Sequence, residues 1–232
     1  MKTIYVDSKD RLPGGSPCQF QILLPQTVDL TGRRVRCDLM RLPITILTVQ
    51  KDRNDTLIVR LGSQNYTVTL SQGQYTGPEL TGHAQSLLTA AAPGSWSFTY
   101  DPSNIAATLT CSNNFTIVGG TFGEQLLGRA YAQTPNSYRF SYLPVTGEDV
   151  VFLCSPNFSS VNNMGPNKSN DVLLPCVITA PYGSVQQFDM PYDVWHDCPG
   201  GAVQSLTFEL RDRRYNLLTA FVSNISFLLS ID

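Results

Sequence analysis

The sequence carries little charge. Only 15% of its 232 residues are charged, and 16 Lys and Arg face 18 Asp and Glu, which gives a net charge of −2 at pH 7. An average soluble domain has about 25% charged residues. Without an excess of positive charge, the chain lacks the electrostatic footprint of a nucleic-acid-binding protein. We therefore expect no sequence-specific binding of nucleic acid.

Long apolar runs are also missing. The longest stretch without a charge, residues 102–123, is rich in Ser, Asn and Thr, and burying these groups in lipid would cost too much free energy. Residues 1–15 contain no apolar run of the length found in secretion signals. The sequence therefore predicts neither insertion into a membrane nor secretion.

Catalytic motifs such as G-x-S-x-G, H-E-x-x-H, the Walker A loop and the EF-hand loop are absent. There are only two histidines, His83 and His196. His196 and Cys198 stand close together, but a zinc site needs four ligands, or three and a water. We therefore expect no enzyme, with no catalytic residue, no cofactor and no bound metal.

The six cysteines contain no C-x-x-C pair, and most stand in strand-like segments. Without a secretion signal a disulfide framework is not favoured, and cysteine in a strand behaves as a small buried hydrophobe. We expect reduced, structural thiols at Cys18, Cys37, Cys111, Cys154, Cys176 and Cys198.

What the sequence does contain is a series of short strand patterns separated by turn residues. Apolar and polar residues alternate in about a dozen segments, among them residues 20–24, 35–39, 206–210 and 225–231. Alternation with a period of two is typical of half-buried strands. Many such strands, with turns at Gly and Pro between them, predict an all-β sandwich or barrel.

One helix interrupts the strands. Thr76 and Glu79 have the spacing of a capping box, several apolar residues then share one helical face, and Pro93-Gly94 ends the pattern. We expect a helix over about residues 77–91 and a shorter helical turn at residues 124–128. With no Pro/Ser-rich linker, residues 1–232 are predicted to form one domain, in which residues 1–13 are an N-terminal arm or an edge strand.

Several segments, in this order, carry a resemblance to a known family. They are residues 4–11 (IYVDSKDR), 20–25 (FQILLP), 30–37 (LTGRRVRC), 73–80 (GQYTGPEL), 96–101 (WSFTYD) and 206–215 (LTFELRDRRY), before the strand at 225–231. The layout resembles the single jelly-roll minor capsid (penton) proteins of Polinton and adintovirus-type elements, with virophage and adenovirus proteins as more distant relatives.

The resemblance implies a single jelly-roll β-sandwich and a structural virion protein. It implies copies that assemble head to tail, as a homopentamer at capsid vertices or as a trimer, and a major capsid protein of the same element as partner. The protein would be made in the host cytoplasm or nucleus and end in the virion. A capsid gene captured by a host would keep the same sequence features.

We predict the residues of the subunit interface from their charge and from their expected positions at strand edges. In the N-terminal segment these are Tyr5, Asp7, Lys9, Asp10 and Arg11. In the turn before the last strand they are Arg211, Arg213 and Arg214.

A different class of function also fits the composition. Six N-x-S/T sequons and ten tyrosines are compatible with a soluble jelly-roll binding module, either lectin-like or a TNF-like trimeric ligand. The tyrosines expected on its loops are Tyr75, Tyr131, Tyr182 and Tyr192.

Overall fold

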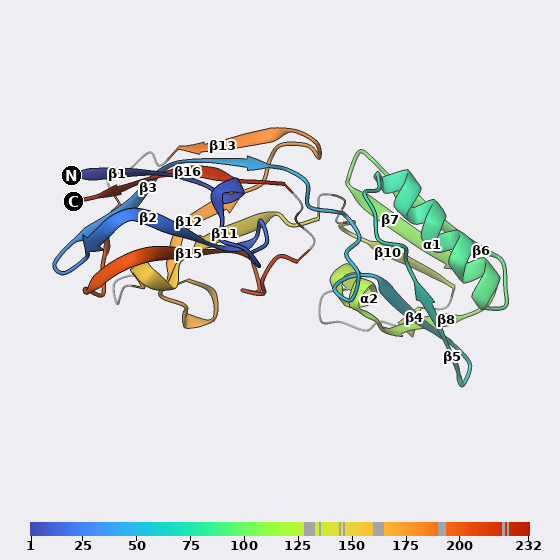
Figure 1. The fold of residues 1–232 in the computed structure, drawn as a ribbon. Coiled ribbons are helices and arrows are strands. Elements are labelled where there is room, and N and C mark those ends of the chain that lie inside the picture. The colour runs from blue at the N-terminus through green and yellow to red at the C-terminus, as the bar shows by residue number, and fades with distance from the viewer. Residues whose placement is uncertain are drawn as a thin grey trace. The chain divides into compact units, whose positions relative to one another are not determined.

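The computed structural model describes residues 1–127, 133–134, 136–143, 145, 147–159, 165–189, 194–219, 221 and 223–232. The chain divides into two compact units (Figure 1). The first unit combines both ends of the chain, Met1–Ile46 and Glu148–Asp232, and the second is Leu47–Gly147. That residues 1–232 act as one domain stays a prediction.

The first unit contains two antiparallel sheets. In the first sheet the strand order is β1 (Lys2–Asp7), β16 (Ser226–Ile231), β3 (Arg34–Pro43), β13 (Val185–Asp189), and the short β14 (His196–Asp197) also pairs with β3. In the second sheet the order is β12 (Val172–Val177), β11 (Val150–Cys154), β15 (Ala202–Asp212), β2 (Gln19–Asp29). Short 3-10 helices lie in the described parts of its connections: η1 (Ser8–Asp10), η2 (Pro156–Phe158) and η3 (Pro166–Lys168).

The chain passes repeatedly from one of these sheets to the other. The connections β1–β2, β2–β3, β12–β13 and β15–β16 each join strands of different sheets, whereas β11 and β12 are neighbours in one sheet. This is the winding of a jelly roll. The predicted fold class, an all-β jelly-roll sandwich, is confirmed.

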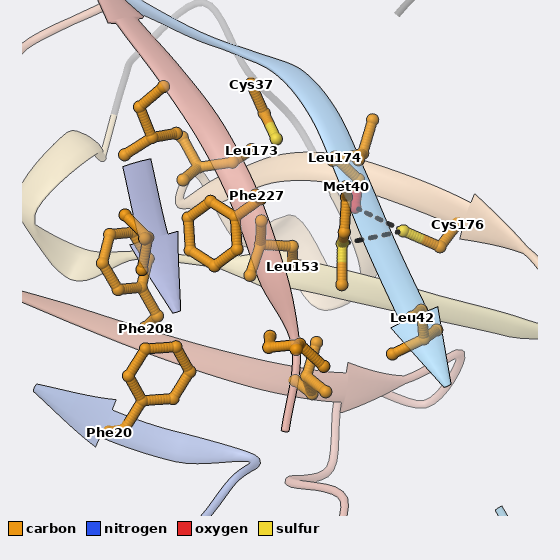
Figure 2. Packing of buried hydrophobic residues seen from close by; sticks show 14 of the residues in the cluster. Phe20, Cys37, Met40, Leu42, Leu153, Leu173, Leu174, Cys176, Phe208 and Phe227 are labelled. Atoms are coloured by element: carbon orange, nitrogen blue, oxygen red, sulfur yellow. Dashed lines mark hydrogen bonds between the residues drawn. The ribbon is translucent and has the colours of Figure 1, made fainter. Parts of the chain in front are cut away.

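The core of the first unit fills the space between its sheets (Figure 2). The ring of Phe208 on β15 lies 5.6 Å from that of Phe20 on β2 and 4.8 Å from that of Phe227 on β16. At another point Cys176 Sγ on β12 is 3.6 Å from Met40 Sδ on β3. Burial of these alternate residues supplies the hydrophobic free energy that holds one sheet against the other.

The second unit has two smaller sheets, two helices and its own core. One sheet has the order β10 (Ser137–Phe140), β7 (Ala106–Cys111), β6 (Trp96–Asp101), and the other has β5 (Gln64–Thr69), β4 (Thr56–Leu61), β8 (Phe115–Gly119), β9 (Gln133–Thr134). The helices are α1 (Gly77–Ala91) and α2 (Thr121–Leu127). No helix in the described part of the chain is long and apolar enough to cross a membrane.

Helix α1 has the predicted bounds because its start is encoded locally. The backbone N–H and the hydroxyl of Thr76 both donate to Glu79 Oε2, at 2.8 Å each. Gly77 leaves room for the ring of Tyr100, since a Cβ at residue 77 would lie 2.4 Å from that ring. The shorter helical turn expected at residues 124–128 corresponds to α2, which begins three residues earlier, at Thr121; residue 128 lies outside the described residues.

Candidate subunit interface

The N-terminal segment forms an edge of the first sheet. Strand β1 pairs with β16 along one side, and on its other side it has no strand partner among the described residues. Val6 is buried in the core, while the neighbouring Tyr5 is 61% exposed. A strand with one unpaired side offers backbone N–H and C=O groups to another chain.

The charged residues after β1 differ in how firmly they are held. Asp7 accepts a hydrogen bond from the backbone N–H of Lys9 at 2.9 Å and lies 3.2 Å from Lys9 Nζ. The hydrogen bond to Asp7 also raises the pKa of Lys9. Arg11 donates from Nη1 to the carbonyl of Ser8 and from Nε to that of Gly15. Its role in the structure is to hold the β1–β2 connection together.

The Arg-rich turn after β15 is built around a buried carboxylate. Asp212 is buried and accepts hydrogen bonds from the backbone N–H groups of Arg214 and Asn216, at 2.9 and 2.7 Å. Tyr215 has a φ of +68°, in the left-handed region that residues other than glycine seldom adopt. The Asp212 hydrogen bonds hold the turn in this strained conformation.

The side chain of Arg211 is held by contacts within this turn. Its guanidinium pairs with Glu209, donates to the carbonyl of Tyr215 at 2.9 Å, and lies 4.6 Å from the centroid of the Tyr215 ring. The Tyr215 hydroxyl in turn donates to Asp171. These contacts give Arg211 a structural role within its own chain.

Arg213 and Arg214 are exposed. Arg213 Nη1 is 3.1 Å from Asp149, but both side chains are more than half exposed, so the pair contributes little to stability. The guanidinium of Arg214 has no hydrogen-bond or ion-pair partner in the described part of the chain, and its carbonyl accepts from Asn167 Nδ2 at 3.0 Å. Arg214 is therefore available for an external contact.

The predicted interface residues occupy two separate sides of the first unit. Tyr5, Asp7 and Asp10 follow the β1 edge. Arg213 lies against Asp149, the residue before Val150 of β11, where β11 pairs with the end of β12. In the described residues no hydrogen bond or ion pair joins the two groups.

A further exposed surface combines Tyr182, which the sequence placed on a loop, with two valines that were not among the sequence predictions. Val177 at the end of β12 and Val185 at the start of β13 are 57% and 62% exposed, and Tyr182 lies in the turn between the strands. Gln186 fixes this corner, because its side chain accepts from the N–H groups of Thr179 and Ala180 and donates to the carbonyl of Val177. The turn was evident in the sequence, but the exposure of the valines depends on β12 and β13 being edge strands.

The two histidines belong to different units. His83 belongs to the second unit, where it accepts from the N–H of Ser71 and stacks on Tyr75. His196 and Cys198 belong to the first unit. Burial lowers the pKa of His196 and raises that of Cys198 to about 11. Across the described ranges, no group of three or more His, Cys, Asp or Glu side chains is placed to hold a metal ion.

Two of the tyrosines considered for ligand recognition lie in the described residues, one in each unit. Tyr75 donates its hydroxyl to the carbonyl of Ser71 and is half-buried. Tyr182 is exposed at the β12–β13 corner. Tyr131 and Tyr192 lie outside the described residues.

Comparison with known proteins identifies the fold. No family model matches the sequence, and no curated protein matches it. Among solved structures, the crystal structure of the mavirus penton protein matches 100% of this chain and 99% of that one, with a TM-score of 0.52 and 8% sequence identity. The fold is penton-like. At this identity the likeness concerns the fold, and it supports a distant penton-like architecture without singling out Polinton or adintovirus proteins.

Proposed function

We propose that the protein is a structural component of a virion, a minor capsid subunit of the penton type. The observation that carries the proposal is the structural match to the mavirus penton protein, which spans essentially the whole of both chains. A jelly roll in this role acts through its shape and its contacts, and it needs no catalytic residue. The assembled capsid is its proposed location, after synthesis in the host cytoplasm or nucleus.

The subunit assembles with copies of itself, as a homopentamer at capsid vertices, and contacts the major capsid protein of the same element. The low charge supports close packing of identical subunits, because 16 basic and 18 acidic residues nearly cancel and like-charge repulsion stays small. The N-terminal segment and the Arg-rich turn, with Tyr5, Asp10, Arg213 and Arg214 exposed, are the proposed contact regions.

The mass of the purified protein in solution tests this function. Light scattering after size exclusion is expected to give five times the chain mass, and negative-stain images are expected to show five-fold rings. A strict monomer over the whole accessible concentration range would contradict self-assembly. A trimer that binds immobilised glycans would instead favour the lectin-like or TNF-like alternative.

A further inference from the structure

Of the seven exposed large apolar side chains in the described part of the first unit, five lie on its two lateral sides, and the other two, Met1 and Val194, precede β1 and β14. The β1–β2 side, formed by edge strands β1 and β2, carries Tyr5 and Leu23. The β12–β13 side, formed by edge strands β12 and β13 and their connection, carries Val177, Tyr182 and Val185. In the described part of the chain, the central strands β16, β3, β11 and β15 carry none. Single exposed apolar residues are ordinary, but their grouping on two opposite sides is typical of contact surfaces.

The strand edges on these sides differ between the two sheets. The edge strands of the second sheet each contain a proline, Pro25 in β2 and Pro175 in β12. Proline has no backbone N–H to donate to a neighbouring strand, so it disfavours the pairing of another chain with that edge. The edge strands of the first sheet, β1 and β13, contain none. Among the described strands, the edges of the first sheet are therefore more open to extension by another chain than those of the second.

Strand direction decides which copies can pair. All neighbours in the order β1-β16-β3-β13 are antiparallel, so three reversals make β13 run opposite to β1. A second copy in the same orientation can therefore place its β1 beside β13 of the first as an antiparallel neighbour. The two copies keep the same orientation and use different surfaces for the contact. Such a contact is called head-to-tail.

Charge complementarity points to the same pairing. In an antiparallel alignment with Tyr5 of one copy opposite Val185 of the next, Lys2 near the start of β1 lies opposite Phe188 near the end of β13. The same alignment brings the end of the unit that carries Asp10 toward the end of the neighbour that carries Arg214. In the described residues neither Asp10 nor Arg214 has an ion-pair partner within its own chain. Opposite charges thus lie at the end of the paired strands where Asp10 and Arg214 meet.

We infer that the β12–β13 side of one copy binds the β1–β2 side of the next, so that the first sheet continues from subunit to subunit. Tyr5 and Leu23 pack against the exposed apolar residues of the β12–β13 corner. This interface rests on the proposed self-assembly. A heterologous contact of this kind closes a ring when the rotation between neighbouring copies divides a full turn evenly.

Single lysine substitutions on each side test the interface. Tyr5→Lys and Val185→Lys each place a charge in the apolar contact, and each is expected to weaken association by about tenfold or more. Tyr142→Lys is the matched control, because Tyr142 is a 49% exposed residue of the second unit. Light scattering over a dilution series measures the association, and circular dichroism verifies that each variant is folded.

Mixing the variants distinguishes a head-to-tail contact from a symmetric one. Each lysine variant pairs weakly with itself, but a mixture retains one intact contact and is expected to give one-to-one heterodimers with wild-type affinity. Independently, oxidation of the double variant Tyr5→Cys, Val185→Cys is expected to give a ladder of linked copies, whereas either single cysteine variant gives none. The cysteine variants keep the test available if a lysine variant does not fold.

The outcomes separate this inference from the proposed function. If the wild type forms a closed oligomer but both lysine variants assemble normally, or if a single cysteine variant cross-links to itself, the inferred interface is wrong and self-assembly stands. If the wild type remains a monomer, the proposed function itself fails.

Discussion

Arg11 donates a hydrogen bond from Nη1 to Asn224 Oδ1 across 3.0 Å, which ties the segment after the first strand to the segment before the last. The same Asn224 oxygen accepts from the hydroxyl of Ser8, whose Oγ also receives the backbone N–H of Ile225. These contacts fasten the end of β1 to the start of β16, the strand with which it pairs.

Loss of this contact is expected to reduce stability. Arg11→Ala removes hydrogen bonds to Asn224, Ser8 and Gly15 and should lower the free energy of unfolding by about 1–3 kcal/mol. Lys9→Ala is the control, because Lys9 is exposed and in the described residues pairs only with Asp7, so its loss should leave stability almost unchanged. Urea titration measures both. Equal effects from the two substitutions would show that Arg11 has no special role.

The core of the first unit makes a stronger prediction. Phe208 is fully buried between Phe20 and Phe227, so Phe208→Ala should destabilise the fold by about 3–5 kcal/mol. Phe208→Leu, which retains most of the volume, is expected to cost clearly less. Chemical denaturation followed by circular dichroism compares the two. A cost below about 1 kcal/mol for the alanine variant would contradict this packing.

How much the sequence revealed depended on how local each feature is. The capping residues Thr76 and Glu79 are neighbours of the helix they start, so α1 was predicted at its observed bounds. Alternation along each segment was enough to identify most strands. The order of strands in a sheet depends on contacts between distant segments, and for that reason the exposure of Val177 and Val185 could not be predicted.

The division into two units left no signal in the composition. Residues 44–47 read Ile-Thr-Ile-Leu, and Ile44 and Ile46 are buried, so the crossing from one unit to the other looks like a strand and not like a linker. Arg211 was assigned to an interface because its neighbours in sequence are also basic. Its contact with Tyr215 depends on the left-handed backbone conformation of Tyr215, which could not be predicted from the sequence.

Helix α1 should show a pH-dependent contribution from its capping carboxylate. Hydrogen bonds from Thr76 lower the pKa of Glu79 below its ordinary value of 4.5. The folded state therefore binds this proton less readily than the unfolded state, and the stabilisation is present above pH 4.5 and is lost as the pH falls through the lowered pKa. Glu79→Gln keeps an acceptor but cannot titrate. The stability difference between wild type and variant should shrink between pH 6 and pH 3, and a constant difference would contradict the cap.

The cysteines should differ in reactivity according to burial. All six are free thiols, five of them buried and Cys198 half-buried. Burial raises the pKa of Cys154 to about 12 and that of Cys198 to about 11, which leaves little thiolate at pH 8. Iodoacetamide at pH 8 should label the native protein slowly and at Cys198 first, whereas the denatured chain should take six labels. Mass spectrometry of digests locates the labels, and rapid labelling of Cys154 in the native protein would contradict its burial.

The two arginines of the last turn should separate folding from assembly. Arg211 is held by Glu209 and Tyr215, so Arg211→Ala is expected to lower stability by about 1–3 kcal/mol. Arg214 has no such partner in the described residues, and Arg214→Asp should leave the unfolding transition unchanged. If Arg214 meets Asp10 of a neighbouring copy, the same substitution should weaken association by roughly two- to fivefold at low salt.

The double exchange Asp10→Arg, Arg214→Asp restores opposite charges and should recover the wild-type association. The single-variant defect should fade at 1 M salt, where the screening length is about 3 Å. A defect that persists at high salt, or that the double exchange deepens, would mean that Arg214 acts through something other than this charge pair.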